Sequence, residues 1–308
     1  MTSDLTNSLS LLVLAAGLGS RYGGLKQLEQ VGPNGETLMD YSIYDAKKAG
    51  FSRIVFLIRE EMLDQFKDQV GKKYDDHIEG EYAFQKMDYL PNGFKKPRGR
   101  SRPWGTGHAV WSARKKLNDS FFAVINADDF YGAETFNLLE KALSKMNSGA
   151  DGPQLISMIG FRLSETLSEH GSVSRGICQE SDGLLQSVEE WTGIGGKPIS
   201  GLNPSGEIRK LSGSEIVSMN VWGFSNKIFN FLEMELSRFL AKLNQEDLSS
   251  EFYLPTAVDS SIQGGISKVE VYHASCSWMG VTYKEDKEKV KSSIMDFVER
   301  ELYPNPLF

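Results

Sequence analysis

Short apolar runs alternate with amphipathic stripes along the first half of the chain. The runs at residues 11–14, 54–58 and 121–125 are typical of strands that a sheet buries on both faces. Stripes of apolar residues at helical spacing lie between and after these runs. They are Met39, Ile43, Ala46 and Ala49, with Gly50 closing the helix, then Val110, Ala113 and Leu117, and then Phe136, Leu139, Leu143 and Met146. This alternation predicts right-handed βαβ units in an α/β fold, with a mostly parallel central sheet and helices on both faces.

The second half of the chain has a different pattern of strands and connections. Residues 155–161 and 216–224 have the pattern of strands, separated by longer connections rich in Gly and Ser, including residues 193–206. Two apolar stripes predict long helices, one over residues 227–244 and one beginning near residue 285. Stripes of this kind are typical of helices that face a core.

Length and composition limit the architecture and its partners. A chain of 308 residues without a long linker is predicted to form a single domain, residues 1–308, with halves of about 1–132 and 133–308. The net charge of −7, from 34 Lys and Arg against 41 Asp and Glu, argues against bulk binding of nucleic acid. An acidic protein that binds a polyanion must do so at a local basic site.

No signal in the sequence predicts a membrane segment or secretion. The first ten residues are polar and lack a basic region, and no apolar stretch approaches the roughly 20 residues that span a bilayer. Cys178 and Cys276 stand far apart without the spacing of a metal site. We therefore expect two reduced thiols in a cytoplasmic protein.

One stretch of the chain is locally basic. Residues 94–102, FKKPRGRSR, carry five Lys or Arg among nine positions, and Pro97 and Gly99 favour a loop over a helix. Two interpretations stay open, namely a solvated surface loop or a flexible arm that closes over phosphates.

A glycine-rich turn follows the first apolar run, within residues 11–28, LLVLAAGLGSRYGGLKQL. Its glycines let backbone N–H groups approach an anion, and Arg21 and Lys26 supply positive charge. The glycines are Gly17, Gly19, Gly23 and Gly24. Their spacing fits neither a dinucleotide fingerprint nor a Walker loop, so the turn predicts a cradle for a triphosphate rather than for NAD. The alternative is an ordinary glycine turn whose two cations are solvated.

Carboxylates follow another strand at the same predicted edge of the sheet. The run Asn126-Ala127-Asp128-Asp129 comes directly after residues 121–125, and ligands of such sheets bind at the carboxyl ends of strands. The glycine turn and this run therefore converge on one crevice. One carboxylate together with phosphate oxygens is a usual way to hold Mg²⁺, which makes Asp128 a sufficient anchor. The alternative is an Asp that caps a helix or a turn.

Four motifs stand in order along the chain. They are LAAGLGSRYGGLKQL; Gln85 with Trp104-Gly105-Thr106-Gly107-His108-Ala109; Asp128 in NADDFYG; and Val188-Glu189-Glu190 with Ser218-Met219-Asn220-Val221-Trp222-Gly223-Phe224. Together they resemble the sugar-1-phosphate nucleotidyltransferase family, the NDP-sugar pyrophosphorylases, which have a GT-A-like, Rossmann-like fold. The likeness covers nearly the whole chain, although Leu25 stands where many members have proline.

The resemblance implies a role for each motif. Arg21 and Lys26 would grip the triphosphate, Asp128 would hold Mg²⁺, and these three residues would be catalytic. Glu190 and Asn220 would hold the sugar, so the first half of the chain would bind the nucleotide and the second half the sugar phosphate. The nucleotide-binding residues would be Ala15, Ala16, Gly17, Gly19, Gln85, Gly105 and Thr106.

The base would be selected by Gln85 and the Gly-Thr-Gly backbone. A glutamine amide offers both a donor and an acceptor to the imide edge of uracil or thymine, and a flipped amide could serve cytosine. Other interpretations stay open. Gln85 would then be an ordinary polar residue at the end of a strand, and His108 would belong to the first turn of a helix rather than act as a base.

One departure from the family pattern concerns the metal. Many members have Trp-x-Asp-x-Gly-Thr near the C-terminus, where this chain has Trp278-Met279-Gly280-Val281-Thr282. Glycine replaces the carboxylate, and the run resembles a Gly-Val-Asn variant of the family motif in which the third residue is the ligand. This resemblance implies Thr282 as a neutral metal ligand, with Asp286 as a weaker candidate.

A second departure concerns the acceptor. After Glu190, Trp191 stands where the family has the lysine that clamps the sugar phosphate. Arg175 or Lys284 could take that part.

The sequence thus predicts an enzyme that uses Mg²⁺ to transfer a nucleotidyl group from UTP or dTTP to a sugar 1-phosphate, giving an NDP-sugar and pyrophosphate. This chemistry needs positioning and charge neutralisation rather than a side-chain nucleophile. Two alternatives stay open: a cytidylyltransferase for phosphocholine or another small phosphate ester, and a catalytically silent nucleotide- or sugar-sensing module. The expected partners are the NTP and the sugar 1-phosphate, with no nucleic acid and no membrane, and the oligomeric state is left open.

Overall fold

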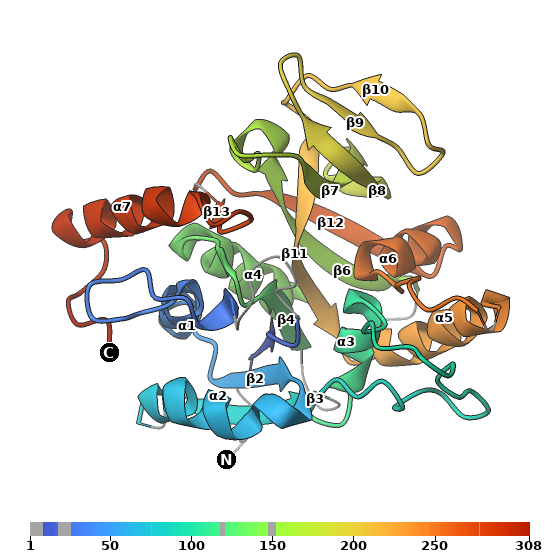
Figure 1. Ribbon diagram of the computed structural model, residues 1–308, viewed down its shortest axis with the longest axis horizontal. Helices are drawn as coiled ribbons and strands as arrows, with labels where there is room; N and C mark the ends of the chain where they lie inside the picture. Colours follow the sequence, from blue (N-terminus) through green and yellow to red (C-terminus); the bar gives the residue numbers. More distant parts are fainter. Residues whose placement is uncertain are drawn as a thin grey trace.

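One large sheet organises the protein. The computed structural model describes residues 9–17, 26–74, 76–117, 121–146, 152–244, 246–276 and 278–308. Its strands are β1 (Ser10–Leu14), β2 (Arg53–Ile58), β3 (Glu79–Phe84), β4 (Phe121–Asn126), β6 (Gln154–Arg162), β7 (Val173–Ser181), β8 (Leu184–Gly195), β9 (Ser200–Leu202), β10 (Ile208–Lys210), β11 (Ile216–Ser225) and β12 (Ser267–His273). Within the described residues these strands follow the order β10-β9-β8-β12-β6-β11-β4-β1-β2-β3, and β7 pairs with β11 and β8 (Figure 1). A separate small pair joins β5 (Asp129–Phe130) to β13 (Met279–Gly280).

Parallel pairing is found around the three apolar runs of the first half. β1 pairs in parallel with β2 and with β4, and β2 pairs in parallel with β3. Beyond β4 the sheet is mixed, because β11 runs antiparallel to both β4 and β6 while β12 runs parallel to β6. The α/β class is confirmed, with its parallel strands gathered mainly in the first half of the chain.

Helices cover both faces of the sheet, because successive residues of a strand point to opposite sides. Leu11 and Val13 of β1 pack in the core that includes α1 (Leu38–Lys48), α2 (Leu63–Gln69) and α4 (Ala133–Lys145). Leu12 packs on the other face, with α3 (Thr106–Ser112), α5 (Ile228–Lys242) and α6 (Leu254–Gln263). These three helices lie together in Figure 1, apart from α1, α2 and α4. α7 (Asp286–Glu299) packs against α1 in a third cluster. Short 3₁₀ turns lie at Lys26–Leu28, Glu60–Met62, Gly71–Lys73 and Leu163–Glu165.

Two predictions of local structure are wrong. Residues 193–206 are not one long connection, because β8 extends to Gly195 and, after a short turn, β9 begins at Ser200. The helix expected to include Ala113 and Leu117 ends at Ser112, and the Ala113 N–H donates to the carbonyl of Val110 in a turn. The long helix expected over residues 227–244 is α5, and the helix expected near residue 285 is α7.

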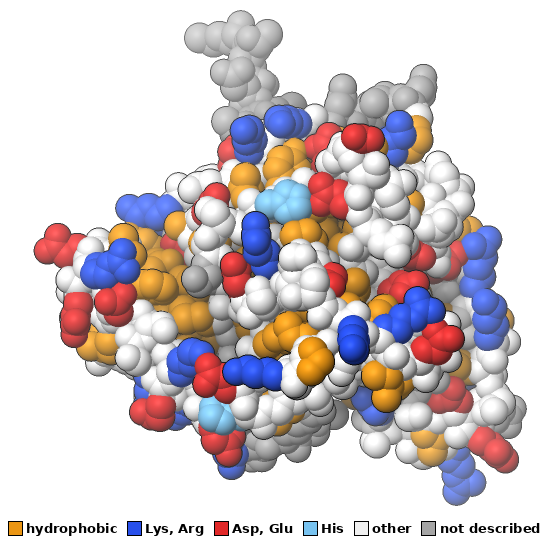
Figure 2. All heavy atoms as spheres, turned by 90° about the horizontal axis from the view of Figure 1, so that it is seen from above, with side chains coloured by type: hydrophobic (Ala, Val, Ile, Leu, Met, Phe, Trp, Pro, Cys, Tyr) orange, Lys and Arg blue, Asp and Glu red, His pale blue; other side chains and the backbone are white. Residues whose placement is uncertain are grey.

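The surface carries charges of both signs. On the face shown in Figure 2, Lys and Arg side chains are interspersed with Asp and Glu rather than gathered into one basic field. Among the described residues, no helix is both long enough and apolar enough to cross a membrane.

Candidate active site

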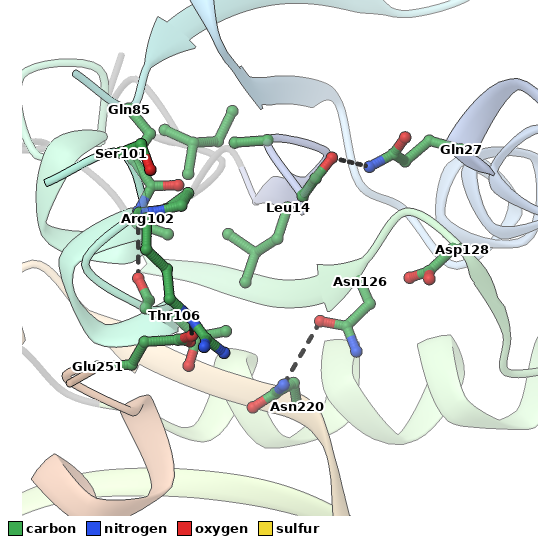
Figure 3. Close-up of a pocket in the computed structure, with 16 residues that line it drawn as sticks. Leu14, Gln27, Gln85, Ser101, Arg102, Thr106, Asn126, Asp128, Asn220 and Glu251 are labelled. Carbon is green, nitrogen blue, oxygen red and sulfur yellow. Dashed lines mark hydrogen bonds and ion pairs between the residues drawn. The ribbon is translucent and has the colours of Figure 1, made fainter. Parts of the chain in front are cut away.

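Two cavities open side by side at the carboxyl ends of β1 and β4. The first chamber, of about 610 Å³, is lined by Gly17, Gln85, Thr106, Arg102 and Glu251, among others. The second chamber, of about 240 Å³, is lined by Arg175, Glu190, Ser218, Trp278 and Thr282, among others. Asn126, Asp128 and Asn220 line both chambers, so these three residues form their common wall. Figure 3 shows their side chains at the edge of the first chamber.

The glycine turn begins at the edge of the first chamber. β1 and β4 are parallel neighbours, so Leu14 lies beside Asn126 and the residues that follow both strands meet. Ala16 and Gly17 line the chamber, and the Gly17 carbonyl accepts a hydrogen bond from Gln27 Nε2 at 2.9 Å. Ala15 is fully buried and donates its N–H to the carbonyl of Leu57 instead.

Part of the predicted cradle lies outside the described residues. Gly19, Arg21, Gly23 and Gly24 belong to this part of the chain. Lys26 begins a short 3₁₀ turn, but its side chain is likewise outside the described part. Their expected contacts with a triphosphate therefore stay predictions.

The two neighbouring aspartates have different surroundings. Asp128 lines both chambers. Asp129 is buried, and its Oδ2 accepts hydrogen bonds from Asn126 Nδ2 at 2.9 Å and from the Tyr131 hydroxyl at 3.0 Å. Asp129 therefore holds the Asn126 amide in place and reaches the second chamber alone, whereas Asp128 lines both chambers.

Asn220 lies at a bulge of β11 with an unusual backbone conformation. The register of β11 against β6 shifts between Ser218 and Trp222, and Asn220 has φ of 60°. A side chain in this region costs energy, and such strain is often found at functional sites. Asn220 Nδ2 lies 3.5 Å from Asn126 Oδ1, whereas its own Oδ1 is buried and has no partner among the described residues (Figure 3). A buried acceptor without a partner is uncommon, and the residue that carries it lines both chambers.

Gln85 comes directly after β3 and is tied to α3. Its Nε2 lies 3.1 Å from the Gly105 carbonyl and 3.2 Å from His108 Nδ1. His108 lies on α3, as expected, and its Nε2 is 2.7 Å from the Tyr89 carbonyl. Burial lowers the pKa of His108 to about 4, so the ring is neutral near pH 7. The expectation that Gln85 offers a ligand both a donor and an acceptor needs correction, because Gly105 and His108 take both amide hydrogens and only Oε1 remains.

The segment at residues 250–254, far away in the sequence, holds the loop at residues 103–105 that precedes α3. The Phe252 N–H donates to the Trp104 carbonyl at 2.7 Å, and the Gly107 N–H donates to the Phe252 carbonyl at 2.9 Å. Thr106 Oγ1 accepts from the Leu254 N–H at 3.0 Å. Gly105 has φ of 94°, and a Cβ on it would lie 2.7 Å from the Phe252 carbonyl oxygen. Glycine is therefore needed where the two segments touch.

The same segment brings Glu251, a residue that no sequence motif marks, to the first chamber. Glu251 forms an ion pair with Arg102 on the chamber wall (Figure 3). Its sequence neighbourhood carries no motif, and more than a hundred residues separate it from the loop that it joins. No local signal could have identified it.

The basic stretch is neither wholly solvated nor wholly mobile. Arg100 is only 2% exposed, and its guanidinium lies 3.7 Å from the centre of the Trp104 ring. Its Nη2 donates to the carbonyls of Ser250 at 2.6 Å and Pro103 at 3.2 Å. Arg100 therefore fastens the loop to the segment that carries Glu251, and Arg102 is the cation of this stretch that lines the first chamber.

Arg175 and Glu190 bring opposite charges into the second chamber. Arg175 Nε donates to Thr166 Oγ1 at 3.1 Å, and its guanidinium lies 5.1 Å from the centre of the Trp278 ring. Burial raises the pKa of Glu190 to about 6, and the nearby Arg175 charge partly offsets this effect. The chamber thus offers a cation and a carboxylate to one ligand.

The C-terminal motif contributes Thr282 rather than a carboxylate. Thr282 lines the second chamber together with Asp128. Gly280 pairs with Asp129 across β5 and β13, and a Cβ on it would lie 2.7 Å from Asp129 Oδ1 and 2.5 Å from the Trp278 ring. A carboxylate at position 280 has no room, because Asp129 and Trp278 fill that space.

Asp286, the weaker metal candidate, and Lys284, one of two candidates for the phosphate clamp, lie away from the chamber walls. Asp286 accepts hydrogen bonds from the N–H groups of Thr282 at 3.1 Å and Tyr283 at 2.8 Å, and from the Ser168 hydroxyl at 3.0 Å. Its carboxylate therefore shapes the turn before α7. Lys284 is exposed and does not line the second chamber.

The residues present fit a magnesium ion that is held partly by its substrate. Among the described residues, no group of three or more His, Cys, Asp or Glu side chains could hold a metal ion. Mg²⁺ needs no such cage, because it usually binds one or two carboxylates together with waters and phosphate oxygens. Asp128, with the Thr282 side chain on the same chamber, matches this donor set.

Comparison with known proteins gives one family model and several similar folds. The nucleotidyl transferase family model matches residues 11–261. A search of curated proteins gives no match.

Solved structures share the fold at low sequence identity. A protein from Bacillus anthracis assigned as a glucose-1-phosphate thymidylyltransferase, in complex with a sucrose, has a TM-score of 0.62 at 12% identity over 94% of this chain and 96% of its own. The inositol-1-phosphate CTP transferase from T. maritima has a TM-score of 0.60 at 14% identity over 94% and 97% of the two chains. A UDP-glucose pyrophosphorylase complexed with UDP-glucose has a TM-score of 0.58 at 13% identity over 94% and 99%.

Proposed function

Because the chain belongs to the nucleotidyl transferase family, we propose that it transfers a nucleotidyl group from UTP or dTTP to a sugar 1-phosphate. The observation that carries this proposal is the common wall of the two chambers, formed by Asn126, Asp128 and Asn220. The first chamber takes the triphosphate and the second takes the sugar phosphate, so the reacting groups meet at this wall. The fold shared with proteins named for nucleotidyl transfer to sugar or inositol phosphates supports this choice of acceptor.

The reaction is one displacement at phosphorus. A phosphate oxygen of the acceptor forms a bond to the α-phosphorus, and the bond from that phosphorus to the oxygen bridging the β-phosphate breaks. Pyrophosphate leaves with the electron pair, and the NDP-sugar remains. Because the reactants are both anions, the protein must mainly align them and offset their charge.

Magnesium would act at the common wall. Bound Mg²⁺ would neutralise the charge that develops on the leaving pyrophosphate. Asp128 would hold it from the protein side, with Thr282 as a neutral oxygen on the same chamber. Arg21 and Lys26 would grip the triphosphate, as the sequence predicts.

Gln85 supports a uracil or thymine base. Its Oε1 is the amide atom left for a ligand, because its Nε2 contacts the Gly105 carbonyl and His108 Nδ1. Where this oxygen faces N3 of a pyrimidine, uracil and thymine donate an N3–H. Cytosine would present a lone pair there and leave both groups unsatisfied, at a cost of about 1–3 kcal/mol.

The second chamber supports a ligand that carries both hydroxyl groups and a phosphate. The Glu190 carboxylate and the unpartnered Asn220 Oδ1 are acceptors suited to sugar hydroxyls. Arg175 supplies a cation for the acceptor phosphate on the same chamber. Glu190 would repel a phosphate placed against it, so these charges orient the sugar with its phosphate toward Arg175 and the common wall.

Pyrophosphate release tests the proposal. Each common nucleoside triphosphate is mixed with Mg²⁺ and, separately, with a panel of sugar 1-phosphates and with phosphocholine. We expect turnover with UTP or dTTP and a sugar 1-phosphate. Turnover with CTP and phosphocholine alone would make the protein a cytidylyltransferase, and stabilisation by ligands without turnover would make it a sensing module. A ligand at 100 times its Kd should stabilise the fold by about 2.7 kcal/mol.

A further inference from the structure

A buried histidine stands directly behind the proposed base-reading glutamine. His108 has no exposed surface, and each of its ring nitrogens has one partner. Nε2 lies 2.7 Å from the Tyr89 carbonyl, which can only accept a hydrogen bond. Nε2 must therefore carry the proton and donate it.

The protonation of one nitrogen decides the state of the other. In a neutral imidazole with its proton on Nε2, Nδ1 is an acceptor. Gln85 Nε2, at 3.2 Å, must then donate to Nδ1, and its second hydrogen goes to the Gly105 carbonyl at 3.1 Å. Both partners are acceptors, so an amide turned the other way would place its oxygen against two lone pairs.

We propose that His108 is a positioning residue for base selection, which fixes the Gln85 amide with its oxygen toward the first chamber. The proposal rests on the function proposed above and assigns the selectivity of Gln85 to a residue that does not line the chamber. The Tyr89 carbonyl sets the tautomer of His108, the tautomer sets the orientation of the amide, and the amide presents an acceptor alone.

The surroundings of His108 keep its ring neutral. Burial lowers the pKa of His108 to about 4, and the positive charges of Arg114 and Arg100 nearby also oppose its protonation. A protonated ring would present N–H to the amide N–H₂ and would favour the opposite amide orientation. Near neutral pH that state is scarcely populated.

The test compares base selectivity in two variants of α3. H108F keeps an aromatic ring but removes one of the two acceptors that hold the Gln85 amide. The amide is then held by the Gly105 carbonyl alone, so it can turn and present N–H to a ligand. S112A is the matched control, because Ser112 is also buried on α3 and donates to the His108 carbonyl at 2.8 Å without contacting Gln85. The readout is kcat/KM for the preferred pyrimidine triphosphate divided by kcat/KM for CTP.

We expect this ratio to fall about tenfold or more in H108F and to stay within about twofold in S112A. An H108F enzyme that keeps the wild-type ratio would overturn the proposal. So would an equal loss of the ratio in S112A, because damage to the helix would then explain both variants.

A measurement on the wild-type protein covers the case in which H108F fails to fold. The chain has four histidines, so the ¹⁵N signals of His108 can be assigned by NMR. We expect a protonated Nε2 and an unprotonated Nδ1, and the reverse tautomer would refute the proposal. If the wild type releases no pyrophosphate with any triphosphate, the proposed function fails. The positioning of Gln85 can then still be tested by the NMR measurement of the His108 tautomer, together with thermal shifts of wild type and H108F in UTP and CTP.

Discussion

Gln85 and Asn220 each keep one side-chain oxygen that accepts no hydrogen bond from the described residues. The nitrogens of both amides donate to groups inside the protein. Gln85 Nε2 contacts the Gly105 carbonyl and His108, and Asn220 Nδ2 contacts Asn126. Asp129 is the opposite case, because its Oδ2 accepts from Asn126 and Tyr131. At the scale of single residues, the site thus contains side-chain amides whose nitrogens already have hydrogen-bond partners in the protein and whose oxygens do not.

Under the proposed function, we expect Asp128 to be the residue whose charge affects the rate most. D128N keeps the shape of the side chain but removes the negative charge that would anchor Mg²⁺. We expect kcat to fall on the order of a hundredfold or more, which corresponds to about 3 kcal/mol of lost transition-state stabilisation. The melting temperature should change little, because Asp128 faces the cavities.

D129N is the matched control for this prediction. It should lower the melting temperature more and the rate less, because Asp129 is buried and holds Asn126. Initial rates over a range of Mg²⁺ concentrations decide the matter. Near-normal rates of D128N at saturating Mg²⁺, or a larger loss in D129N, would show that the metal assignment is wrong.

At the scale of elements, the start of α3 and the segment before α6 act as one unit. Backbone hydrogen bonds join Trp104 and Gly107 to Phe252, and Thr106 accepts from Leu254. This unit carries Gly105, Thr106 and Glu251 into the first chamber. Disturbing the contact between the two segments should therefore affect both stability and nucleotide binding.

Gly107→Ala tests the unit directly. A Cβ at this position would lie 2.7 Å from the ring of Phe252, which is itself buried. We expect a loss of about 1–3 kcal/mol in the free energy of unfolding in urea and a higher KM for the nucleotide.

Gly80→Ala in β3 is the control, because its Cβ would meet Phe56 at an ordinary 3.7 Å. The control should change neither quantity strongly. A G107A protein with wild-type stability and KM would show that the two segments are not coupled.

The elements also show what the sequence pattern could and could not predict. β1, β2 and β4 were predictable because both of their faces are buried, which produces continuous apolar runs. β7 and β8 mix buried and exposed positions and contain no such run, so they were missed. The predicted family is confirmed, and Asp128, Asn220 and Glu190 were singled out from motifs alone. The contacts of Glu251, Arg100 and Gln85 were beyond reach, because they join segments far apart in the chain.

At the scale of the whole molecule, the C-terminal segment closes back onto the first helix. The Tyr303 hydroxyl donates to Asp45 Oδ2 of α1 at 2.7 Å, and its ring packs edge-on against Tyr41 at 5.0 Å between centres. Asp45 is 3% exposed, and burial raises its pKa to about 7 despite the Tyr303 hydrogen bond. The contact between the C-terminal segment and α1 therefore contains a carboxyl group that titrates near neutral pH.

The sign of this linkage follows from the two pKa values. The native carboxyl keeps its proton up to about pH 7, whereas the unfolded carboxyl loses it near its ordinary value of about 4. The native state binds more protons between these values, so the contribution of Asp45 to stability is full below pH 4 and is lost as the pH rises to 7.

Asp45→Asn should remove this part of the pH dependence. Because Asn carries no charge, the free energy of unfolding of D45N relative to wild type should rise between pH 4 and pH 8. A shift of about three pKa units at about 1.4 kcal/mol per unit gives a rise on the order of 4 kcal/mol. Urea unfolding of both proteins across this range measures the difference. A constant difference would mean that Asp45 does not titrate between these limits.

The common wall of the two chambers has a consequence for competition between ligands. An NDP-sugar would extend from the first chamber into the second past Asn126, Asp128 and Asn220, whereas pyrophosphate would occupy the triphosphate end of the first chamber alone. In equilibrium binding, the NDP-sugar should therefore displace both the triphosphate and the sugar 1-phosphate, and pyrophosphate should displace the triphosphate alone. Simultaneous binding of the NDP-sugar and the sugar 1-phosphate would show that the chambers are independent. With mutual exclusion, the enzyme cannot begin a new turnover until the product has cleared both chambers, so accumulated NDP-sugar would itself restrain its synthesis.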